Sequence, residues 1–207
     1  AVGSSFFIAG CTTILSFLLA LPTSYALGRR QLKGAGFFKT LMLLPLVLPG
    51  MAMAIFLGRM LMKMGLSGTY TGVILAHTLM GVPYMMRILV VSFESVPQDL
   101  VDAASNLGAT AFTRFAEVYF PMVLPGLVAG SIFTFINSME EFNLTFIIGL
   151  PTVKTIPTVL FSYLGESFAR TRASVVSLIL LIPNLTLLLI TERFIKTEYM
   201  GAALGKM

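Results

Sequence analysis

The amino-acid sequence predicts an all-α membrane protein, folded as a polytopic bundle of hydrophobic helices. Hydrophobic residues make up 57% of the 207-residue chain, and charged residues make up only 11%. A soluble domain carries about 25% charged residues, and the mean hydropathy of this chain is +0.91. Because such a chain cannot cover its surface with polar groups in water, we expect lipid to surround it. Five long apolar segments supply the expected spans.

Each apolar segment is close to the length of about 20 residues that a helix needs to cross a bilayer. Prolines interrupt most of them, and we expect neighbouring helices and water to satisfy the carbonyl groups that these prolines leave free. No repeat, linker or low-complexity tract separates the segments, so we expect one domain over residues 1–207. The expected spans are roughly Ser5 to Leu27, Phe38 to Leu61, Thr71 to Val91, Met122 to Met139 and Ser174 to Thr191.

A polar stretch at about 95–120, between the third and fourth expected spans, is predicted to form a pair of short helices. Pro97 suits the first position of a helix, and Ser95 and Gln98 have the spacing of a capping box. Gly108 is a natural end for this helix because glycine adopts the left-handed conformation. Thr110 can cap a second short helix, and Pro121 is expected to open the next hydrophobic span. The first helix has one apolar face at helical spacing, formed by Leu100, Val101, Ala104 and Leu107.

The same stretch resembles the signature of the permease subunits of bacterial ABC importers. That signature consists of Glu-Ala-Ala, three residues, Gly, nine residues and Ile-x-Leu-Pro. This chain has Asp102-Ala103-Ala104 followed by Gly108 at the same distance, and then Val118-Tyr119-Phe120-Pro121 nine residues later. It departs from the signature by Asp for Glu, Val for Ile and Phe for Leu, but the spacing is intact.

The resemblance implies the type I importer fold, with a sixth span before Ala1 and a cytoplasmic pair of coupling helices. It implies a multi-pass transport subunit of the bacterial inner membrane, and not an enzyme. Its expected partners are two cytoplasmic ATP-binding subunits, a second permease in a homodimer or heterodimer, a periplasmic substrate-binding protein and membrane lipid. An amphipathic helix can lodge in a groove of an ATPase through a few anchors. The residues expected to couple the chain to the ATPase are Asp102, Ala103, Ala104, Gly108, Arg114 and Pro121.

Basic residues near the ends of the expected spans predict that the 95–120 stretch is cytoplasmic. Basic residues on the same side of the membrane as this stretch outnumber those on the opposite side. The first group is Arg29, Arg30, Lys33, Lys39, Arg114, Arg193, Lys196 and Lys206, and the second is Arg59, Lys63, Lys154, Arg170 and Arg172.

The segment 140–172 is predicted to fold back over the external mouth of the bundle, because its apolar run is short and broken by Gly149, Pro151 and Pro157. Polar residues beside it are expected to line the substrate pathway. The stretch 137–145 resembles permeases for polyamines, opines and aminoethylphosphonate, which implies a small amine-bearing solute. An ordinary water-exposed helix end is the alternative for the two glutamates. The expected pathway residues are Asn137, Ser138, Glu140, Glu141 and Asn143.

Several kinds of chemistry lack the residues that they need. A nucleotide-binding P-loop is absent, since the tail Gly201 to Lys206 has the wrong spacing. One cysteine, Cys11, and one histidine, His77, cannot form a metal-ligand cluster or a catalytic triad. We therefore expect no metal and no cofactor, and we read both residues first as packing groups. No basic and aromatic patch indicates nucleic-acid binding.

Two other functional classes remain open. An ion-coupled secondary transporter would need no ATPase, but it predicts charges deep in several spans and inverted repeats, which the sequence does not show. A membrane scaffold would use the helix pair for docking and would have no pathway. A G-x-x-x-G pattern at Gly126 and Gly130 predicts close helix packing, with a second permease as one possible partner.

Overall fold

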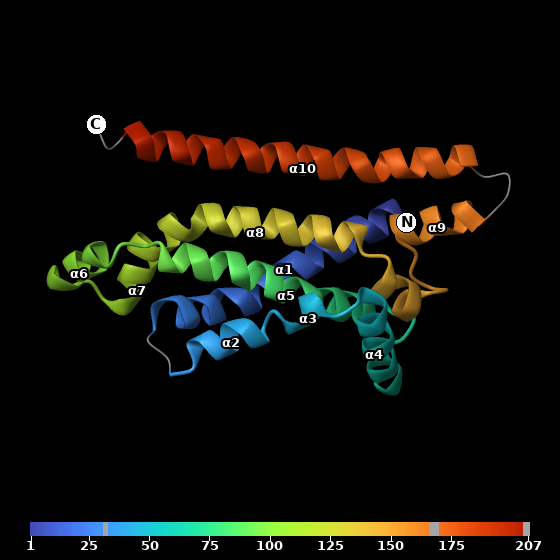
Figure 1. Ribbon diagram of the computed structural model, residues 1–207, viewed down its shortest axis with the longest axis horizontal. Coiled ribbons are helices and arrows are strands. Elements are labelled where there is room, and N and C mark those ends of the chain that lie inside the picture. Colours follow the sequence, from blue (N-terminus) through green and yellow to red (C-terminus); the bar gives the residue numbers. More distant parts are fainter. Residues whose placement is uncertain (31–32, 166–169, 205–207) are drawn as a thin grey trace.

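The computed structural model describes residues 1–30, 33–165 and 170–204, and within these ranges the chain forms helices and no strand (Figure 1). Four long helices are α1 (Val2–Arg29), α5 (Tyr70–Glu94), α8 (Phe120–Glu140) and α10 (Arg170–Leu204). The shorter elements are α2 (Ala35–Leu41), α3 (Leu44–Val47), α4 (Gly50–Lys63), α6 (Gln98–Asn106), α7 (Ala111–Arg114), α9 (Ile156–Gly165) and the π-helical turns η1 (Phe115–Tyr119) and η2 (Thr145–Gly149).

Helices α1, α5 and α8 pack against one another and form the centre of the bundle, while α10 lies along α8 and α9. Helix α1 packs closely because it buries small side chains at steps of three or four residues, as membrane helices commonly do. Many large apolar side chains face outward instead, including Leu18, Leu19 and Leu189. This distribution suits a lipid environment. The buried face of α1 consists of Ser5, Ile8, Ala9, Thr12, Ser16, Ala20, Ser24 and Leu27.

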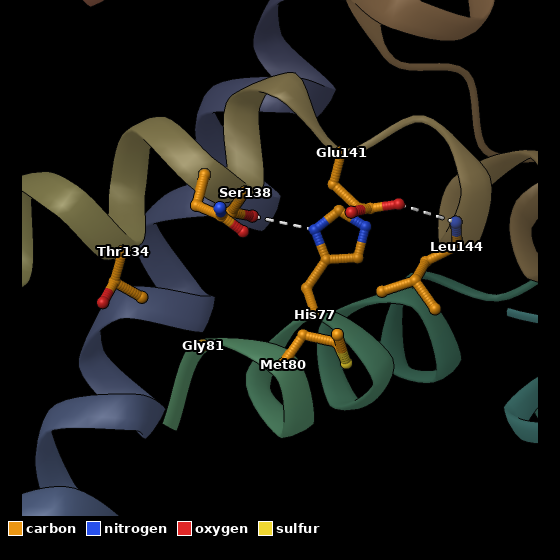
Figure 2. A pocket seen from close by; sticks show the side chains of 8 residues that line it. His77, Met80, Gly81, Thr134, Ser138, Glu141 and Leu144 are labelled. Carbon is orange, nitrogen blue, oxygen red and sulfur yellow. Dashed lines mark hydrogen bonds between the residues drawn. The ribbon is translucent and has the colours of Figure 1, made fainter. Parts of the chain in front are cut away.

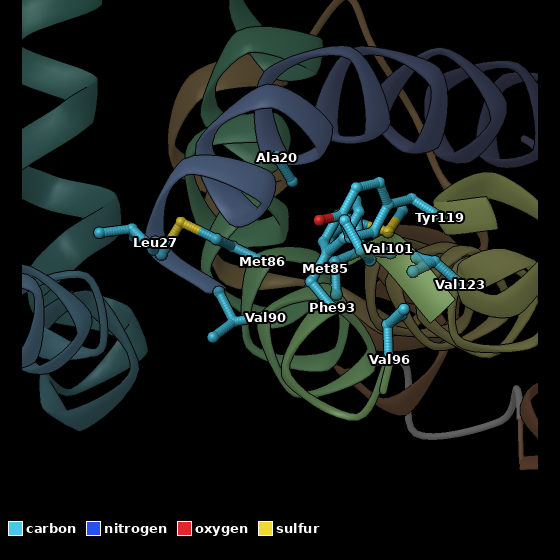
Figure 3. Close-up of a cluster of buried hydrophobic side chains, with 11 residues drawn as sticks. Ala20, Leu27, Met85, Met86, Val90, Phe93, Val96, Val101, Tyr119 and Val123 are labelled. Atoms are coloured by element: carbon cyan, nitrogen blue, oxygen red, sulfur yellow. The ribbon is translucent and has the colours of Figure 1, made fainter. Parts of the chain in front are cut away.

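The largest hydrophobic cluster lies where α1, α5 and α8 meet the 95–120 stretch (Figure 3). Phe93 is fully buried there, and the ring of Tyr25 contacts the rings of Phe93, Phe115 and Tyr119 edge-on at centroid distances of 5.3–5.6 Å. Val101 contributes the buried side chain of α6. The base of the predicted coupling stretch is thus fixed to the spans by aromatic packing.

Four of the five expected spans are single helices, but the second is broken. Helices α2 and α3 together make a bend of 97° with α4, at Leu48 and Pro49. Pro45 and Pro49 lack the N–H group that a continuous helix needs at these positions. The expected second span, Phe38 to Leu61, is therefore a bent pair of helices rather than one straight helix.

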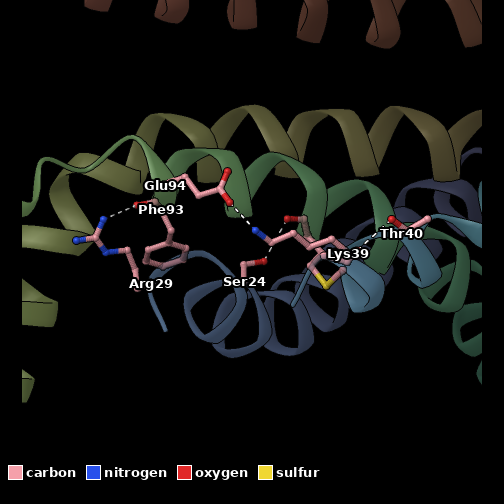
Figure 4. A network of polar contacts seen from close by, with 8 residues as sticks. Ser24, Arg29, Lys39, Thr40, Phe93 and Glu94 are labelled. Atoms are coloured by element: carbon pink, nitrogen blue, oxygen red, sulfur yellow. Dashed lines mark hydrogen bonds and ion pairs between the residues drawn. The ribbon is translucent and has the colours of Figure 1, made fainter. Parts of the chain in front are cut away.

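The chain still crosses between α1 and α5. Both helices end at the same side of the bundle, because Arg29 at the end of α1 contacts the carbonyl groups of Phe93 and Val96. Helix α2 begins at that side, where Lys39 forms an ion pair with Glu94 (Figure 4). Helix α4 contacts η2 at the opposite side. The segment from α2 to α4 therefore returns across the bundle, and counting this bent pair as one span raises the number of spans within the described residues from four to five.

The predicted helix pair differs from the structure in its second member. Helices α7, η1 and α8 form one helical run from Ala111 to Glu140, so the second short helix is the beginning of the fourth span. Pro121 does not open this span but lies in the first turn of α8, within the run. The capping box is also wrong, because α6 begins after Pro97 without a side-chain cap.

The segment after α8 packs back onto the bundle. Turn η2 contacts α4 and α5, and Ile148 and Val153 are fully buried. Its external position stays a prediction. Residues 166–169 of the predicted segment, and the Gly205-Lys206 pair of the tail, lie outside the described residues, as do the side chains of Arg170, Arg193 and Lys196.

Candidate functional site

The predicted coupling stretch forms an exposed tip at one end of the bundle (Figure 1). Of the expected apolar face of α6, Val101 is buried, whereas Leu107 is 88% exposed. Phe112, on α7, is 80% exposed. Asp102 and Ala103 are exposed, and Ala104 is half-buried. The tip thus presents two large apolar side chains and a carboxylate to whatever binds it.

The turn after α6 is closed by backbone hydrogen bonds. Gly108 has a φ of 82°, and its N–H group donates to the carbonyl of Ser105 while that of Ala109 donates to the carbonyl of Ala104. These two bonds make a Schellman motif, which glycine in the left-handed conformation favours. The prediction that Gly108 ends this helix is therefore confirmed.

Two side chains hold the next helical turn. Thr110 Oγ1 accepts a hydrogen bond from the N–H group of Thr113, as expected for a cap. Arg114 Nη1 donates to the carbonyl of Ala109 at 2.8 Å. Arg114 therefore holds the turn against the helix that carries Arg114, so its guanidinium is not an isolated surface charge.

Sequence reasoning missed the contacts of Asp102. Gln98 Nε2 donates to Asp102 Oδ1 at 2.8 Å, and Gln98 Oε1 of the same side chain accepts from Arg29 at the end of α1. Residues four apart lie on one helix face and commonly form hydrogen bonds, so the spacing of Gln98 and Asp102 could have predicted their contact. No local pattern points to Arg29, which is 69 residues away from Gln98.

A second group of polar side chains lies toward the opposite end of the bundle (Figure 2). His77 is 3% exposed. Its Nδ1 lies 2.8 Å from Ser138 Oγ and its Nε2 lies 3.0 Å from Thr145 Oγ1. These hydrogen bonds join α5, α8 and η2. The reading of His77 as a hydrogen-bonded packing residue agrees with this geometry.

A small cavity of about 10 Å³ lies beside His77. It has the size of about one water molecule. Glu141 reaches into its wall, and Glu141 Oε1 accepts a hydrogen bond from the N–H group of Leu144 (Figure 2). The lining residues are His77, Met80, Gly81, Thr134, Asn137, Ser138, Glu141 and Leu144.

The predicted pathway residues therefore separate into two groups. Asn137, Ser138 and Glu141 line the cavity. Glu140 instead accepts a hydrogen bond from Asn184 Nδ2 on α10 at 2.7 Å. The side chain of Asn143 lies next to Gly50 at the start of α4. The two adjacent glutamates thus do not form one paired carboxylate site.

The G-x-x-x-G pattern packs within the chain. A Cβ atom at Gly126 would lie 1.8 Å from Ser92 Oγ, and one at Gly130 would lie 2.9 Å from Met85 Sδ. Both glycines therefore face α5, so the expectation that they lie against a second permease is wrong. Among residues that the structure describes, no group of His, Cys, Asp or Glu side chains could hold a metal ion.

The chain matches the family described as "Binding-protein-dependent transport system inner membrane component" over residues 11–197. It is 28% identical to the molybdenum transport system permease protein ModB of Haemophilus influenzae, over 93% of this chain and 91% of that protein. It is 30% identical to the sulfoquinovosyl glycerol transport system permease protein SmoH of Agrobacterium fabrum, over 79% of this chain. It spans only 58% of SmoH.

Solved structures share the fold. The MetNI methionine ABC transporter, in inward facing conformations, matches with a TM-score of 0.74 at 16% identity, over 94% of this chain and 92% of that chain. A bacterial ABC transporter involved in the import of alginate matches with a TM-score of 0.69 at 15% identity, over 93% of this chain and 73% of that chain.

The family, the fold and the apolar helices agree with one another. The family match makes the chain the membrane component of a transport system and not an enzyme, with the ATPase as a separate subunit. It is a multi-pass protein of the inner membrane. The chain therefore belongs to the family of binding-protein-dependent transport system inner membrane components, the permeases of ABC importers.

Proposed function

We propose that this permease forms the pathway for a small solute delivered by a periplasmic binding protein, and that ATPase subunits drive it through α6. One observation carries the proposal. The stretch with the signature spacing, from Asp102 to Gly108, forms an exposed helix that ends in a hydrogen-bonded turn. A short helix whose exposed side chains face the cytoplasm, and whose base is packed rigidly, suits the helix-in-groove mode of binding.

The direction of force follows from how this tip is attached. Closure of an ATPase dimer would displace the tip, and the aromatic cluster around Tyr25 would pass that displacement to α1, α5 and α8. Packed cores move as rigid bodies between discrete states rather than deforming continuously. A second permease subunit, as a copy or a related chain, supplies the other wall of the pathway.

The structure supports an amine-bearing solute through one carboxylate. Glu141 lies half-buried at the cavity beside His77. A carboxylate near membrane depth is energetically costly, so such a residue is commonly retained for a function. Glu140 gives less support, because it bonds to Asn184 on α10 and does not line the cavity.

An oxyanion is the second candidate solute. Relatives named for molybdenum transport motivate it. Arg59 and Lys63 also lie exposed on one face of α4, beside Phe56 and Met60, and they have no acidic partner within the described residues. Two unpaired cations four residues apart repel each other on a helix and favour a bound anion.

The test is uptake by the complete complex, copurified with its ATPase and binding protein and reconstituted into vesicles. The solutes are radiolabelled putrescine, molybdate and a neutral sugar. We expect ATP-dependent uptake of putrescine that falls in Glu141→Gln and persists in Glu140→Gln. Uptake of molybdate that falls in Arg59→Gln would instead identify an oxyanion, and not an amine, as the transported solute.

Two outcomes would contradict the mechanism. Uptake that persists without any ATPase would favour an ion-coupled secondary transporter. Stable binding of the ATPase with no movement of any solute would favour a scaffold.

A further inference from the structure

Arg29, the last residue of α1, makes more side-chain contacts than its place at a span end suggests. Its Nη1 donates to the carbonyl of Val96 at 2.9 Å and to that of Phe93 at 3.4 Å. Its Nη2 donates to Gln98 Oε1, and its Nε donates to the hydroxyl of Tyr119 at 3.3 Å. One side chain thus contacts the end of α5, the start of α6 and the turn η1. Figure 4 shows the bond from Arg29 to Phe93.

These contacts suit the chemistry of arginine. The last carbonyl groups of a helix lack donors from a following turn, and that of Phe93 accepts from the N–H group of Val96 as well as from Arg29. A cation at a helix C-terminus is also favoured by the helix dipole. The guanidinium carries five N–H donors in a rigid plane. Its carbon atom also lies 5.1 Å from the centre of the Tyr119 ring, within the range of a cation–π contact. A lysine could not reach all of these acceptors with one nitrogen.

The contacts of Arg29 continue to the signature residue. Gln98 accepts from Arg29 through its carbonyl oxygen and donates to Asp102 through its amide nitrogen. A continuous series of hydrogen bonds therefore joins Asp102 on α6 to the end of α1. A charged donor makes the bond from Arg29 to Gln98 stronger than a neutral one.

Few other contacts attach α6 to these two spans. Val101 is the buried side chain of α6 and belongs to the hydrophobic cluster that includes residues of α1 and α5, while the main packing neighbours of α6 are α7 and η1. Without the Arg29 contacts, a displacement of α6 would reach α1 and α5 only through this apolar packing and the aromatic cluster around Tyr25.

We propose that Arg29 is a positioning residue that passes the displacement of α6 to α1 and α5. The proposal rests on the proposed function, in which ATPase subunits bind α6. It assigns to Arg29 a role in transmission and not in binding of the ATPase, because its side chain is half-buried against the end of α5 and Tyr119.

The experiment uses the complex with its ATPase and follows the external end without any solute. In a Cys11→Ala background, Asn143→Cys is labelled with a membrane-impermeant maleimide in the presence and absence of ATP and vanadate. The amount of copurified ATPase and the thermal midpoint are measured on the same samples. We compare Arg29→Gln and Arg29→Lys with Arg30→Gln. Arg30 is the exposed neighbour, and the same positive charge is removed there.

We expect Arg29→Gln to copurify with normal amounts of ATPase while its ATP-dependent change in labelling rate falls about tenfold, the scale of one lost charge-assisted hydrogen bond. Arg29→Lys should keep part of the change, and Arg30→Gln should keep all of it. If Arg29→Gln unfolds, Gln98→Leu replaces it, since this change breaks the bonds of Gln98 to Arg29 and Asp102 and leaves the other Arg29 contacts in place; we expect a partial loss of the response.

An unchanged labelling response in Arg29→Gln, or in Gln98→Leu where that variant is used, would overturn the role of Arg29 and leave the proposed function standing. Equal losses in Arg29→Gln and Arg30→Gln would also overturn it, because charge alone would then explain the effect. A wild-type complex that binds no ATPase, or shows no response to ATP, would instead overturn the proposed function.

Discussion

The two ends of the bundle assemble their candidate residues differently. At the coupling end, Asp102, Gly108 and Arg114 belong to one short stretch, and the turn between them is closed by local hydrogen bonds. At the opposite end, His77 meets side chains that are 61 and 68 residues away in the chain. The first arrangement depends on local sequence, whereas the second exists only after α5, α8 and η2 have packed.

This difference separates binding from stability. Changes at the exposed tip should affect partner binding and leave the fold intact, because Leu107 and Phe112 contact little of the chain. Changes at the buried end should lower stability first, because the side chains there fill space between helices. Four predictions test this separation, beginning with the largest expected effect.

Gly108→Pro should abolish transport. Proline fixes φ near −65°, whereas Gly108 has a φ of 82° and donates its N–H group to Ser105. The cost of about 3 kcal/mol or more corresponds to at least about a hundredfold loss of uptake, since each 1.4 kcal/mol is about tenfold. Uptake and copurification of the ATPase measure it.

Gly65→Pro is the matched control. Gly65 also has a positive φ, of 70°, and donates its N–H group to Met62, but it lies on the loop between α4 and α5. It should lose similar stability and still bind the ATPase. Failure of both variants to bind would mean that misfolding, and not the tip, explains the result.

Gly81→Val should destabilise the opposite end. An added Cβ atom would lie 2.8 Å from Ser16 Oγ and 2.9 Å from Thr134 Cγ2, in the centre of the bundle. Overpacking of this kind costs about 1–3 kcal/mol. Thermal unfolding in detergent measures the loss. Gly10→Val, where no atom lies within 4 Å of the added Cβ atom, should unfold at the temperature of the wild type.

Asp102→Lys should lower uptake about tenfold, the effect of about 1.4 kcal/mol. It removes the acceptor of the Gln98 amide and reverses a charge on the docking face. Its thermal midpoint should stay close to that of the wild type. Asp99→Lys is the control, because it reverses a charge on the same helix at a residue that makes no side-chain contact with Asp102. Full uptake in Asp102→Lys would contradict the docking role.

His77→Leu should cost about 1 kcal/mol, since hydrogen bonds between membrane helices contribute about 0.6 kcal/mol each. It leaves Ser138 and Thr145 without their ring partner. Thr78→Val, which removes only a bond to a carbonyl of its own helix, should cost less. Equal thermal midpoints for the two variants would show that the His77 contacts do not hold the three elements together.

The sequence was sufficient for features that depend on neighbouring residues. The apolar segments predicted the crossings, and the spacing around Gly108 and Thr110 predicted the turn. The continuous run from α7 into α8 was missed because Pro121 indicated a boundary, whereas in the structure Pro121 lies inside the run, just after the π-helical turn η1. A helix can also continue through the π-helical turn η1.

The long-range contacts could not be predicted in the same way. Neighbouring positions indicated one site for Glu140 and Glu141, but the backbone leaves the helix at Glu141 and turns the two side chains toward different elements. Arg29 was counted as a charge that orients the chain. Its four acceptors come together only when three elements meet.

The broken second span has a consequence for what surrounds it. Because Pro45 and Pro49 have no N–H group, the carbonyl oxygens four residues before them lose their usual helical donors. Hydrocarbon tails offer no replacement donors, so such oxygens persist only against protein or water. We therefore expect the corner between α3 and α4 to face protein or water rather than acyl chains.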